Sequence, residues 1–476
     1  MLLSSILLLL PEIILSTFSM AAVIIGVFSN RNSISNSILW SSCLLFILLA
    51  FWILFFEKSE LMAFDGAFVT DPFSDFVKVL LLVCGAIILG LSREYLKQNQ
   101  LLKFEYPVLI SLAMVGMMLM VSANNLIALY MSIELQSLAL YVIASFRRDS
   151  VKSTEAGLKY FVLGALSSGL FLYGVTLVYG FTGSTSFEII GEVVENEPIS
   201  LGILVGLIFL VVGMLFKIAV VPFHMWTPDV YEGAPTSITS YFAVVPKVAG
   251  LALLIKFMFI PFSKILLEWQ TIIIFISIAS MILGAVAAMV QKNFKRLLAY
   301  SSIGHIGYAL AGVATGAVSG YQSTIVYISI YVIMNIGAFS CLYLLKKDGQ
   351  YKENISDLSG ISKKNPLLAI SLLIILFSLA GVPPLGGFFA KFYVFVSVLE
   401  KEMYALAIIG LLTTVMSAFY YLKIIKTIYF DDSVITFESS KNRTAQISIF
   451  TSCIILVTFF LYPSVLNNIV NTLFIN

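Results

Sequence analysis

The sequence predicts an all-α protein that crosses a lipid bilayer about fourteen times. Hydrophobic residues make up 60% of the 476 residues, charged residues only 11%, and the mean hydropathy is +1.01. A soluble domain averages about 25% charged residues and about 45–50% apolar residues. Because no soluble fold of this length needs so much apolar surface, lipid must be the solvent for most of the chain.

Fourteen apolar segments account for nearly the whole sequence. A helix needs roughly 20 residues to cross the hydrocarbon core, so fourteen spans leave room for short loops only. The first segment has no basic region before it and no obvious cleavage site, which predicts a retained helix rather than a signal peptide. The predicted segments are 2–27, 38–56, 73–91, 107–122, 126–144, 156–179, 201–221, 238–259, 270–290, 297–314, 321–345, 366–399, 404–428 and 445–462.

The basic residues predict the orientation of these spans. If the N-terminus lies outside, the outside loops carry only Lys58, Lys264 and Lys401, together with the acidic run Glu188, Glu192, Glu195 and Glu197. The inside loops then carry nineteen basic residues: Arg31, Arg93, Lys97, Lys103, Arg147, Arg148, Lys152, Lys292, Lys295, Arg296, Lys346, Lys347, Lys352, Lys363, Lys364, Lys423, Lys426, Lys441 and Arg443. This positive-inside bias predicts that both termini face the periplasm.

Two spans are interrupted by prolines and glycines. The first interruption, at the end of the seventh segment, contains Pro222 and Pro228, and the second, in the twelfth, contains Pro383, Pro384 and Gly386. Lipid cannot satisfy the backbone groups that such breaks free, so the breaks must face protein or water.

The spacing of these breaks predicts an internal repeat. Pro222 and Pro383 are 161 residues apart, and the Tyr-x-Ser-Ile patterns that begin at Tyr130 and Tyr300 are 170 apart. Both offsets fit two five-helix repeats, segments 4–8 and 9–13, the second inverted relative to the first, as in many secondary transporters. The predicted parts are three N-terminal helices (1–106), the first repeat (107–260), the second repeat (261–430) and a C-terminal helix (431–476).

Four charged residues lie deep inside apolar segments: Glu134, Lys217, Lys247 and Lys391. A charge at the bilayer centre costs roughly 2.5–3.5 kcal/mol, so four cost on the order of 10–14 kcal/mol. Such groups usually face the interior of the bundle and mark an ion or proton path. The alternative is a structural ion pair, but one carboxylate cannot neutralise three lysines.

These residues suggest a route for protons. We expect Glu134 to interact with Lys217, Lys247 to pass a proton sideways, and Lys391 to open to the outside. Lys78, Lys159 and Lys256 lie near segment ends, where a long side chain can reach the interface. Their position is thus explained by snorkelling, and they are not counted among the deep charges.

The remaining polar residues give weaker signals. His305, within a span, is either a proton relay or a hydrogen-bonded interior residue, and the same choice holds for His224 at the first break. Asp229 and Glu232 are expected on an inside loop, where they are either solvated or collect protons. The four cysteines stand singly in apolar segments, without metal or redox spacing.

Several function classes are excluded by the absence of their motifs. The sequence has no P-loop, no glycine fingerprint for dinucleotides and no cysteine cluster. We therefore expect no bound nucleotide, metal or iron–sulfur cluster in this chain, and no contact with nucleic acid. The energy for transport must then come from partner subunits.

Four stretches resemble the antiporter-like membrane subunits of respiratory complex I, an NADH-quinone oxidoreductase. Residues 122–138, which include Glu134, and 155–169, which include Lys159, are similar to the group as a whole. Residues 222–236 and 381–393 are similar to its subunit N branch in particular. The sister subunit M typically has a carboxylate at the position of Lys391, and subunit L is longer.

The resemblance implies that quinone reduction elsewhere in a complex drives protons through this chain in the bacterial inner membrane. It implies roles for Glu134, Lys217, Lys247 and Lys391, with Lys159 as a possible connector. NADH, FMN, iron–sulfur clusters and quinone would be bound by partner subunits. The expected neighbours are lipid, the sister antiporter-like subunit and small membrane subunits.

Three alternatives remain. A sodium/proton antiporter shares this kind of fold, but a sodium site needs oxygen ligands, and the deep set offers a single carboxylate. A membrane subunit of a hydrogenase complex is a second alternative. A structural scaffold is the third, and it leaves four costly buried charges unexplained.

Overall fold

The protein is built almost wholly of α-helices, as predicted. The computed structural model describes residues 6–29, 32–55, 61–196, 198–432, 437–438 and 442–474. Within these residues, thirteen helices are long and apolar enough to cross a membrane. The chain divides into two compact units, residues 1–218 with 233–269, and residues 219–232 with 270–476. The four-part division at residues 106, 260 and 430, and the inverted repeat, stay predictions.

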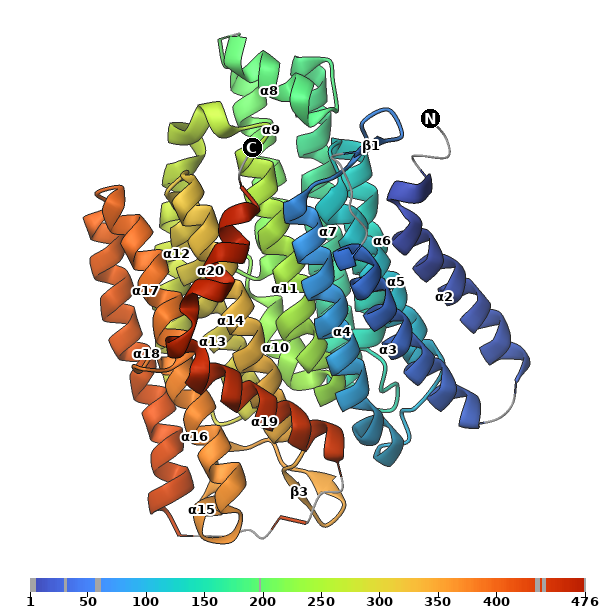
Figure 1. Ribbon diagram of the computed structural model, residues 1–476, viewed down its shortest axis with the longest axis vertical. Helices are drawn as coiled ribbons and strands as arrows, with labels where there is room; N and C mark the ends of the chain where they lie inside the picture. Colours follow the sequence, from blue (N-terminus) through green and yellow to red (C-terminus); the bar gives the residue numbers. More distant parts are fainter. Residues whose placement is uncertain are drawn as a thin grey trace. The chain divides into compact units, whose positions relative to one another are not determined.

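The first unit contains the first eight predicted spans. Figure 1 shows α5, α6 and α7 side by side, and α7 also packs along α9. The α7–α9 contact is close because Gly174 lies against the backbone of Gly206, where a Cβ atom would come within 2.8 Å of the carbonyl oxygen. The helices are α2 (Leu10–Phe28), α3 (Asn32–Phe55), α4 (Pro72–Gln98), α5 (Glu105–Ser122), α6 (Leu126–Ala144), α7 (Val151–Thr182), α8 (Phe187–Asn196), α9 (Leu201–Ile218) and α11 (Thr236–Phe259).

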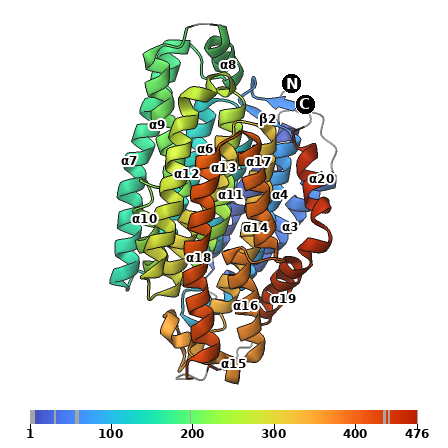
Figure 2. The same cartoon turned by 90° about the vertical axis from the view of Figure 1, so that its left-hand side faces the viewer.

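The second unit contains the remaining predicted spans. In it α14 packs against α13, α16, α17 and α19 (Figure 2). Two of its helices, α10 and α12, each have one end in the first unit. The helices are α10 (Trp226–Gly233), α12 (Leu266–Met289), α13 (Phe294–Ala314), α14 (Val318–Leu342), α15 (Ile361–Lys364), α16 (Pro366–Ala380), α17 (Gly386–Glu400), α18 (Tyr404–Phe430), α19 (Arg443–Thr458) and α20 (Pro463–Thr472).

Some short elements were not predicted. Two antiparallel hairpins form, β1 (Leu61–Ala63) with β2 (Phe68–Thr70) and β3 (Lys346–Lys347) with β4 (Gln350–Tyr351). The acidic run expected as a loop forms α8 instead, and Glu195 in it pairs with Lys264 at 2.6 Å. The predicted loop residues Arg31, Lys58, Glu197 and Lys441, and both chain ends, lie outside the described residues.

The two predicted interruptions are present. The seventh span stops at Ile218 and resumes as α10 at Trp226, and the twelfth is divided between α16 and α17 by residues 381–385. Each break contains one cis X–Pro bond, Val221–Pro222 and Pro383–Pro384. A helix that ends inside a membrane leaves its last carbonyl groups without intrahelical donors. The second break divides the twelfth predicted segment into two helices of 15 residues each, and neither of them is among the thirteen long spans.

Three helices are shielded from lipid along almost their whole length. In the most apolar stretches of α11, α13 and α14, 94% of the residues are buried. In α7, by contrast, only 39% of the corresponding stretch is buried. Lys247 lies on α11 and His305 on α13, so the helices that carry these polar groups are the ones best protected from acyl chains.

The prediction that Lys78 and Lys256 snorkel to the interface was wrong. Lys78 on α4 is 1% exposed and pairs with Glu12 of α2 at 2.6 Å. Lys256 on α11 is 4% exposed, pairs with Asp71 at 3.1 Å and donates to the carbonyl of Val121 at 3.0 Å. The charged residues were near segment ends in the sequence, but neighbouring helices cover them and supply carboxylate partners. These two pairs connect α2, α4, α5 and α11.

We predict that Gly387→Ala destabilises the second break. A Cβ atom at Gly387 of α17 would lie 1.8 Å from the carbonyl oxygen of Ser378 in α16, and overpacking of this kind costs about 1–3 kcal/mol or more. The measurement is the thermal unfolding midpoint of the purified full chain, followed with a thiol-reactive dye, because all four cysteines are buried. Gly169→Ala is the control, since nothing lies within 4 Å of a Cβ there. Equal midpoints for the two variants would contradict the prediction.

We predict that Lys78→Met alone is much more damaging than the double variant Glu12→Leu/Lys78→Met. The single change leaves the Glu12 carboxylate, 2% exposed, without its cation. Removing one member of a buried pair costs about 3–5 kcal/mol, whereas replacing both by apolar residues is often neutral. The same dye assay measures both variants. A double variant as unstable as the single one would show that the pair is not the source of the loss.

Candidate functional site

Lys217 lies at the end of the helix that stops at the first break. It is in the last turn of α9 and is 7% exposed. Its Nζ donates to Ser137 Oγ at 2.6 Å and, more weakly, to the hydroxyl of Tyr141 at 3.5 Å. The ring centroids of Tyr141 and Phe216 lie 5.7 and 5.8 Å from Nζ. The ammonium group is therefore held by a neutral hydroxyl and aromatic faces, which can bind it without cancelling its charge.

Glu134 lies one turn before Ser137 on the same helix. The start of α6 is fixed by Asn125, whose side chain accepts from the backbone N–H of Ile127 at 2.8 Å and donates to Thr185 at 2.8 Å. Residues three apart on a helix share a face, so Glu134 and Ser137 project to the same side of α6. The Oε1 atom of Glu134 is buried and accepts no hydrogen bond in the structure.

The predicted Glu134–Lys217 contact is therefore electrostatic and not a direct ion pair. Lys217 lies close enough to Glu134 to be attracted by its charge, but its hydrogen bond goes to Ser137.

Lys247 is in the middle of α11. It is 1% exposed and directly follows Pro246, the proline inside this helix. A proline in a helix interior cannot donate to the carbonyl four residues earlier, which loosens the backbone ladder at that point. Lys247 thus lies deep in a buried helix, as predicted, next to a point where one backbone hydrogen bond of that helix is missing.

Lys391 lies just after the second break, in the second turn of α17, and is 5% exposed. Its Nζ donates to the carbonyls of Ala380 at 3.1 Å and Leu379 at 3.4 Å, the last residues of α16. It also lies 4.8 Å from the centroid of the Tyr308 ring. A cation at a helix C-terminus interacts favourably with the free carbonyls and the helix dipole. Lys391 therefore satisfies groups that the break itself exposes.

His305 is part of a buried group of tyrosines in the second unit. It is 3% exposed, and its Nδ1 lies 2.7 Å from the hydroxyl of Tyr327 while its Nε2 lies 3.2 Å from that of Tyr421. The Tyr421 hydroxyl also bonds Ser301 Oγ. His305 is thus an interior residue with hydrogen bonds on both ring nitrogens, and its partners are hydroxyl groups that can accept or donate.

The other predicted polar residues lie elsewhere. Lys159 is 41% exposed on the surface of α7 and pairs with Glu155 at 2.7 Å, so it is not among the buried lysines of the first unit. Asp229 and Glu232 are on α10 rather than on a loop, and both accept from Arg296 of α13, at 2.7 and 3.1 Å. His224 lies in the first break, and its Nδ1 is buried.

Sequence reasoning missed the serine and tyrosine side chains that contact the predicted site residues. Ser137, Tyr141, Tyr308 and Tyr421 were not singled out, although each is a polar residue in an apolar span. Because the chain has 22 tyrosines, the sequence alone does not indicate which of them lie beside a site residue. Which tyrosine contacts a lysine depends on how α6 and α9 each pack against α7. In the second unit it depends on how α13 packs against α17 and α18.

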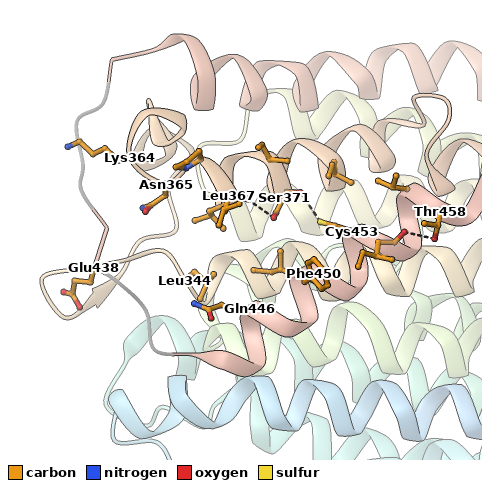
Figure 3. A pocket seen from close by; sticks show the side chains of 17 residues that line it. Leu344, Lys364, Asn365, Leu367, Ser371, Glu438, Gln446, Phe450, Cys453 and Thr458 are labelled. Atoms are coloured by element: carbon orange, nitrogen blue, oxygen red, sulfur yellow. Dashed lines mark hydrogen bonds between the residues drawn. The ribbon is translucent and has the colours of Figure 1, made fainter.

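One groove in the second unit lies away from these residues. It has a volume of about 810 Å³ and runs between α16 and α19, lined mostly by apolar side chains such as Leu367 and Phe450, with Lys364 and Asn365 at one end (Figure 3). None of the six predicted site residues lines it. Among the described residues, no group of three or more His, Cys, Asp or Glu side chains is placed to hold a metal ion.

Comparison with known proteins agrees with the family expected from the motifs. Residues 123–417 match the family described as NADH:quinone oxidoreductase/Mrp antiporter, TM. Subunit N of NADH-quinone oxidoreductase from Pelagibacter ubique is 52% identical over 466 residues, which cover 97% of this chain and 98% of that protein. Subunit N 1 from Rhizobium meliloti is 50% identical over 432 residues, 90% of each chain.

Solved structures agree in fold. A chain of respiratory complex I from Thermus thermophilus superposes with a TM-score of 0.82 at 30% identity, covering 96% of this chain and 98% of that one. A chain of the Mrp complex from Dietzia sp. has a TM-score of 0.81 at 19% identity, covering 99% and 97%, a likeness of fold alone. With half of its residues identical over nearly its full length, the chain belongs to the subunit N branch of the antiporter-like membrane subunits of NADH-quinone oxidoreductases.

Proposed function

We propose that this chain is the proton-translocating membrane subunit of an NADH-quinone oxidoreductase. The observation that carries the proposal is the burial of Lys217, Lys247 and Lys391, which are 7%, 1% and 5% exposed inside apolar helices. Buried lysines of this kind are costly and mark proton or ion paths in membrane proteins. The subunit N relatives are named for the same complex.

The first step is assigned to Glu134 and Lys217. Lys217 donates to Ser137, which is one helical turn from Glu134. In this proposal the lysine side chain moves from the neutral hydroxyl toward the carboxylate. With Glu134 near, the ammonium form is stabilised; bound only to Ser137, the lysine releases its proton more readily. The distance between Glu134 and Lys217 thus sets the proton affinity of Lys217.

The later steps are assigned to the other predicted residues. Lys247 accepts the proton from Lys217 and passes it toward Lys391 in the second unit, from which it leaves to the outside. Lys159, exposed on α7 with Glu155, is proposed as a connector to a neighbouring subunit, because a charged pair on a lipid-facing helix is costly unless protein or water covers it. His305 is proposed as a relay in the second unit.

The driving force is assigned to partner subunits. We expect no redox centre in this chain, and place NADH, FMN, the iron–sulfur clusters and quinone in those partners. The expected membrane neighbours are the sister antiporter-like subunit and small membrane subunits. The basic loops support a place in the bacterial inner membrane with both termini periplasmic.

The cation/proton antiporter is the weaker alternative. The matched family includes Mrp antiporters, and a chain of an Mrp complex has the same fold. The identity to that chain is 19%, against 52% and 50% for subunit N relatives over nearly the whole sequence. The relatives therefore favour the oxidoreductase over the antiporter.

We predict that Glu134→Gln and Lys217→Gln each lower NADH-driven proton pumping several-fold in inside-out membrane vesicles. Each change removes one of the two charges whose attraction sets the proton affinity of Lys217. The measurement is the rate of acidification per NADH oxidised, at equal amounts of assembled complex. Lys264→Gln is the matched control, because Lys264 is exposed and pairs with Glu195 away from the buried lysines. Undiminished pumping in both test variants would exclude the assigned roles.

A further inference from the structure

The groove between α16 and α19 takes no part in the proton route proposed above. It has a volume of about 810 Å³, and all the residues that line it belong to the second unit (Figure 3). Binding sites for small molecules have volumes of about 300–1,000 Å³, so the groove is large enough to hold a ligand. On the surface of a membrane-spanning bundle, the occupant of such a groove is either a lipid-like molecule or a neighbouring protein.

The long walls of the groove are apolar and uncovered. Leu367 of α16 is 82% exposed, and Phe450 of α19, on the opposite wall, is 66% exposed. Two hydroxyl groups along the walls are already bonded within their own helices, Ser371 to the carbonyl of Leu367 at 2.9 Å and Thr458 to that of Ile454 at 2.8 Å. The walls therefore suit an apolar occupant.

One end of the groove, by contrast, is polar (Figure 3). The side chains that line this end are Lys364, Asn365, Glu438 and Gln446. The Glu438 carboxylate is occupied, because it pairs with Lys346 at 3.5 Å and accepts from the backbone N–H of Gly349 at 2.8 Å. Lys364 is exposed at the end of α15, and among the residues that the structure describes no carboxylate pairs with it. Its positive charge is thus available to an anionic group.

The length of the groove matches one leaflet of a bilayer. On α19 the lining runs from Gln446 to Thr458, twelve residues further on, which is about 18 Å at the rise of an α-helix. The hydrocarbon core is about 30 Å thick, so one leaflet occupies about 15 Å of it. The polar end lies where α16 and α19 begin, on the side that the basic loops place inside. An acyl chain of an inside-leaflet lipid can therefore extend along the whole groove.

A spanning helix of a neighbouring subunit matches the groove less well. Such a helix needs roughly 20 residues, or about 30 Å, whereas the lining stops at Thr458. Beyond Thr458 the chain turns through Phe459–Leu461, and the ring of Phe459 packs against that of Phe389 on α17, with 5.8 Å between the centroids. A groove with one charged end that stops about halfway through the core is suited to a molecule with one charged head and an apolar tail.

We propose that the groove between α16 and α19 binds a phospholipid of the inside leaflet that carries a net negative charge. One acyl chain lies between the apolar walls, and the phosphate group lies at Lys364, beside the amide of Asn365. The walls contribute the burial of the chain, and Lys364 selects the charge of the head group. The site is independent of the proposed function, because none of the residues assigned to proton transfer lines it.

The test uses the whole complex in vesicles of phosphatidylethanolamine and phosphatidylglycerol, with a trace of phosphatidylglycerol that has a photoreactive group on one acyl chain. After illumination, the labelled peptides are identified by mass spectrometry. Label is expected on residues 366–374 and 446–458. Added unlabelled phosphatidylglycerol is expected to compete for these positions, and phosphatidylcholine is not.

A charge variant tests the head-group contact. Lys364→Gln is expected to lower the labelling of both segments about fivefold, as for the loss of one lysine that attracts an anionic lipid. Lys363→Gln is the matched control, because Lys363 is the preceding residue, pairs with Asp432 at 3.5 Å and does not line the groove. Both lysines are exposed, so neither change is expected to disturb folding.

A second variant tests the apolar walls without changing a charge. Ser371→Trp places an indole ring between the walls and is expected to lower the labelling of residues 446–458 by excluding the acyl chain. Val415→Trp on α18 is the control, because Val415 is 71% exposed and does not line the groove. Labelling is compared at equal amounts of assembled complex.

Three results would overturn the proposal. Equal labelling by a photoreactive phosphatidylcholine, unchanged in Lys364→Gln, would reduce the groove to ordinary contact with bilayer lipid. No label on residues 366–374 and 446–458 of the assembled complex would mean that a neighbouring subunit covers the groove. Equal losses in Lys364→Gln and Lys363→Gln would assign the effect to the overall charge of the inside surface.

Discussion

Neither a backbone carbonyl nor an ammonium group can be left unpaired in the hydrocarbon core, and the arrangement of the second break follows from this constraint. When α16 ends at Ala380, its last carbonyls have no donor within the helix. Lys391, in the next helix, donates to two of them. The break exposes the carbonyls and the lysine satisfies them, so each feature makes the other tolerable in a membrane. Gly387 allows the approach, because its backbone N–H bonds Ser378 where no side chain would fit.

The buried lysines differ in the partners that hold them. Lys78, Lys256 and Lys295 are paired with the carboxylates of Glu12, Asp71 and Glu353. Lys217 and Lys391 instead donate to a serine hydroxyl and to backbone carbonyls. A carboxylate partner keeps the proton on the lysine, because losing it would leave a bare negative charge in the interior. A neutral partner tolerates the amine and the ammonium form alike. This difference in partners supports the proposal that Lys217 and Lys391 exchange protons.

The same reasoning applies to the interior of the second unit, where most buried polar contacts are made by hydroxyl groups. Carboxylates and an arginine occur at the partly exposed start of α13, and Lys391 at the break. The buried polar contacts elsewhere in this unit are made by the hydroxyl groups of Ser301, Tyr421 and Tyr308, which carry no charge, and by His305, which bonds two tyrosines. Neutral hydroxyls can be buried when they are hydrogen-bonded, whereas a row of ionised groups would add a desolvation cost for each member.

The sequence by itself determined the helical membrane fold, the family and the positions of both breaks, because apolar segment length, loop charge and proline placement act locally along the chain. It also singled out Glu134, Lys217, Lys247 and Lys391, since a charge in an apolar span is conspicuous wherever it occurs. Only the tertiary structure decided which partner each charge has. Lys78 and Lys256, expected at the interface, proved to be buried against carboxylates 66 and 185 residues away in the chain. Lys217 proved to bond Ser137 rather than Glu134. Partners of this kind are set by how helices distant in sequence pack side by side, and hydropathy along one chain carries no record of that packing.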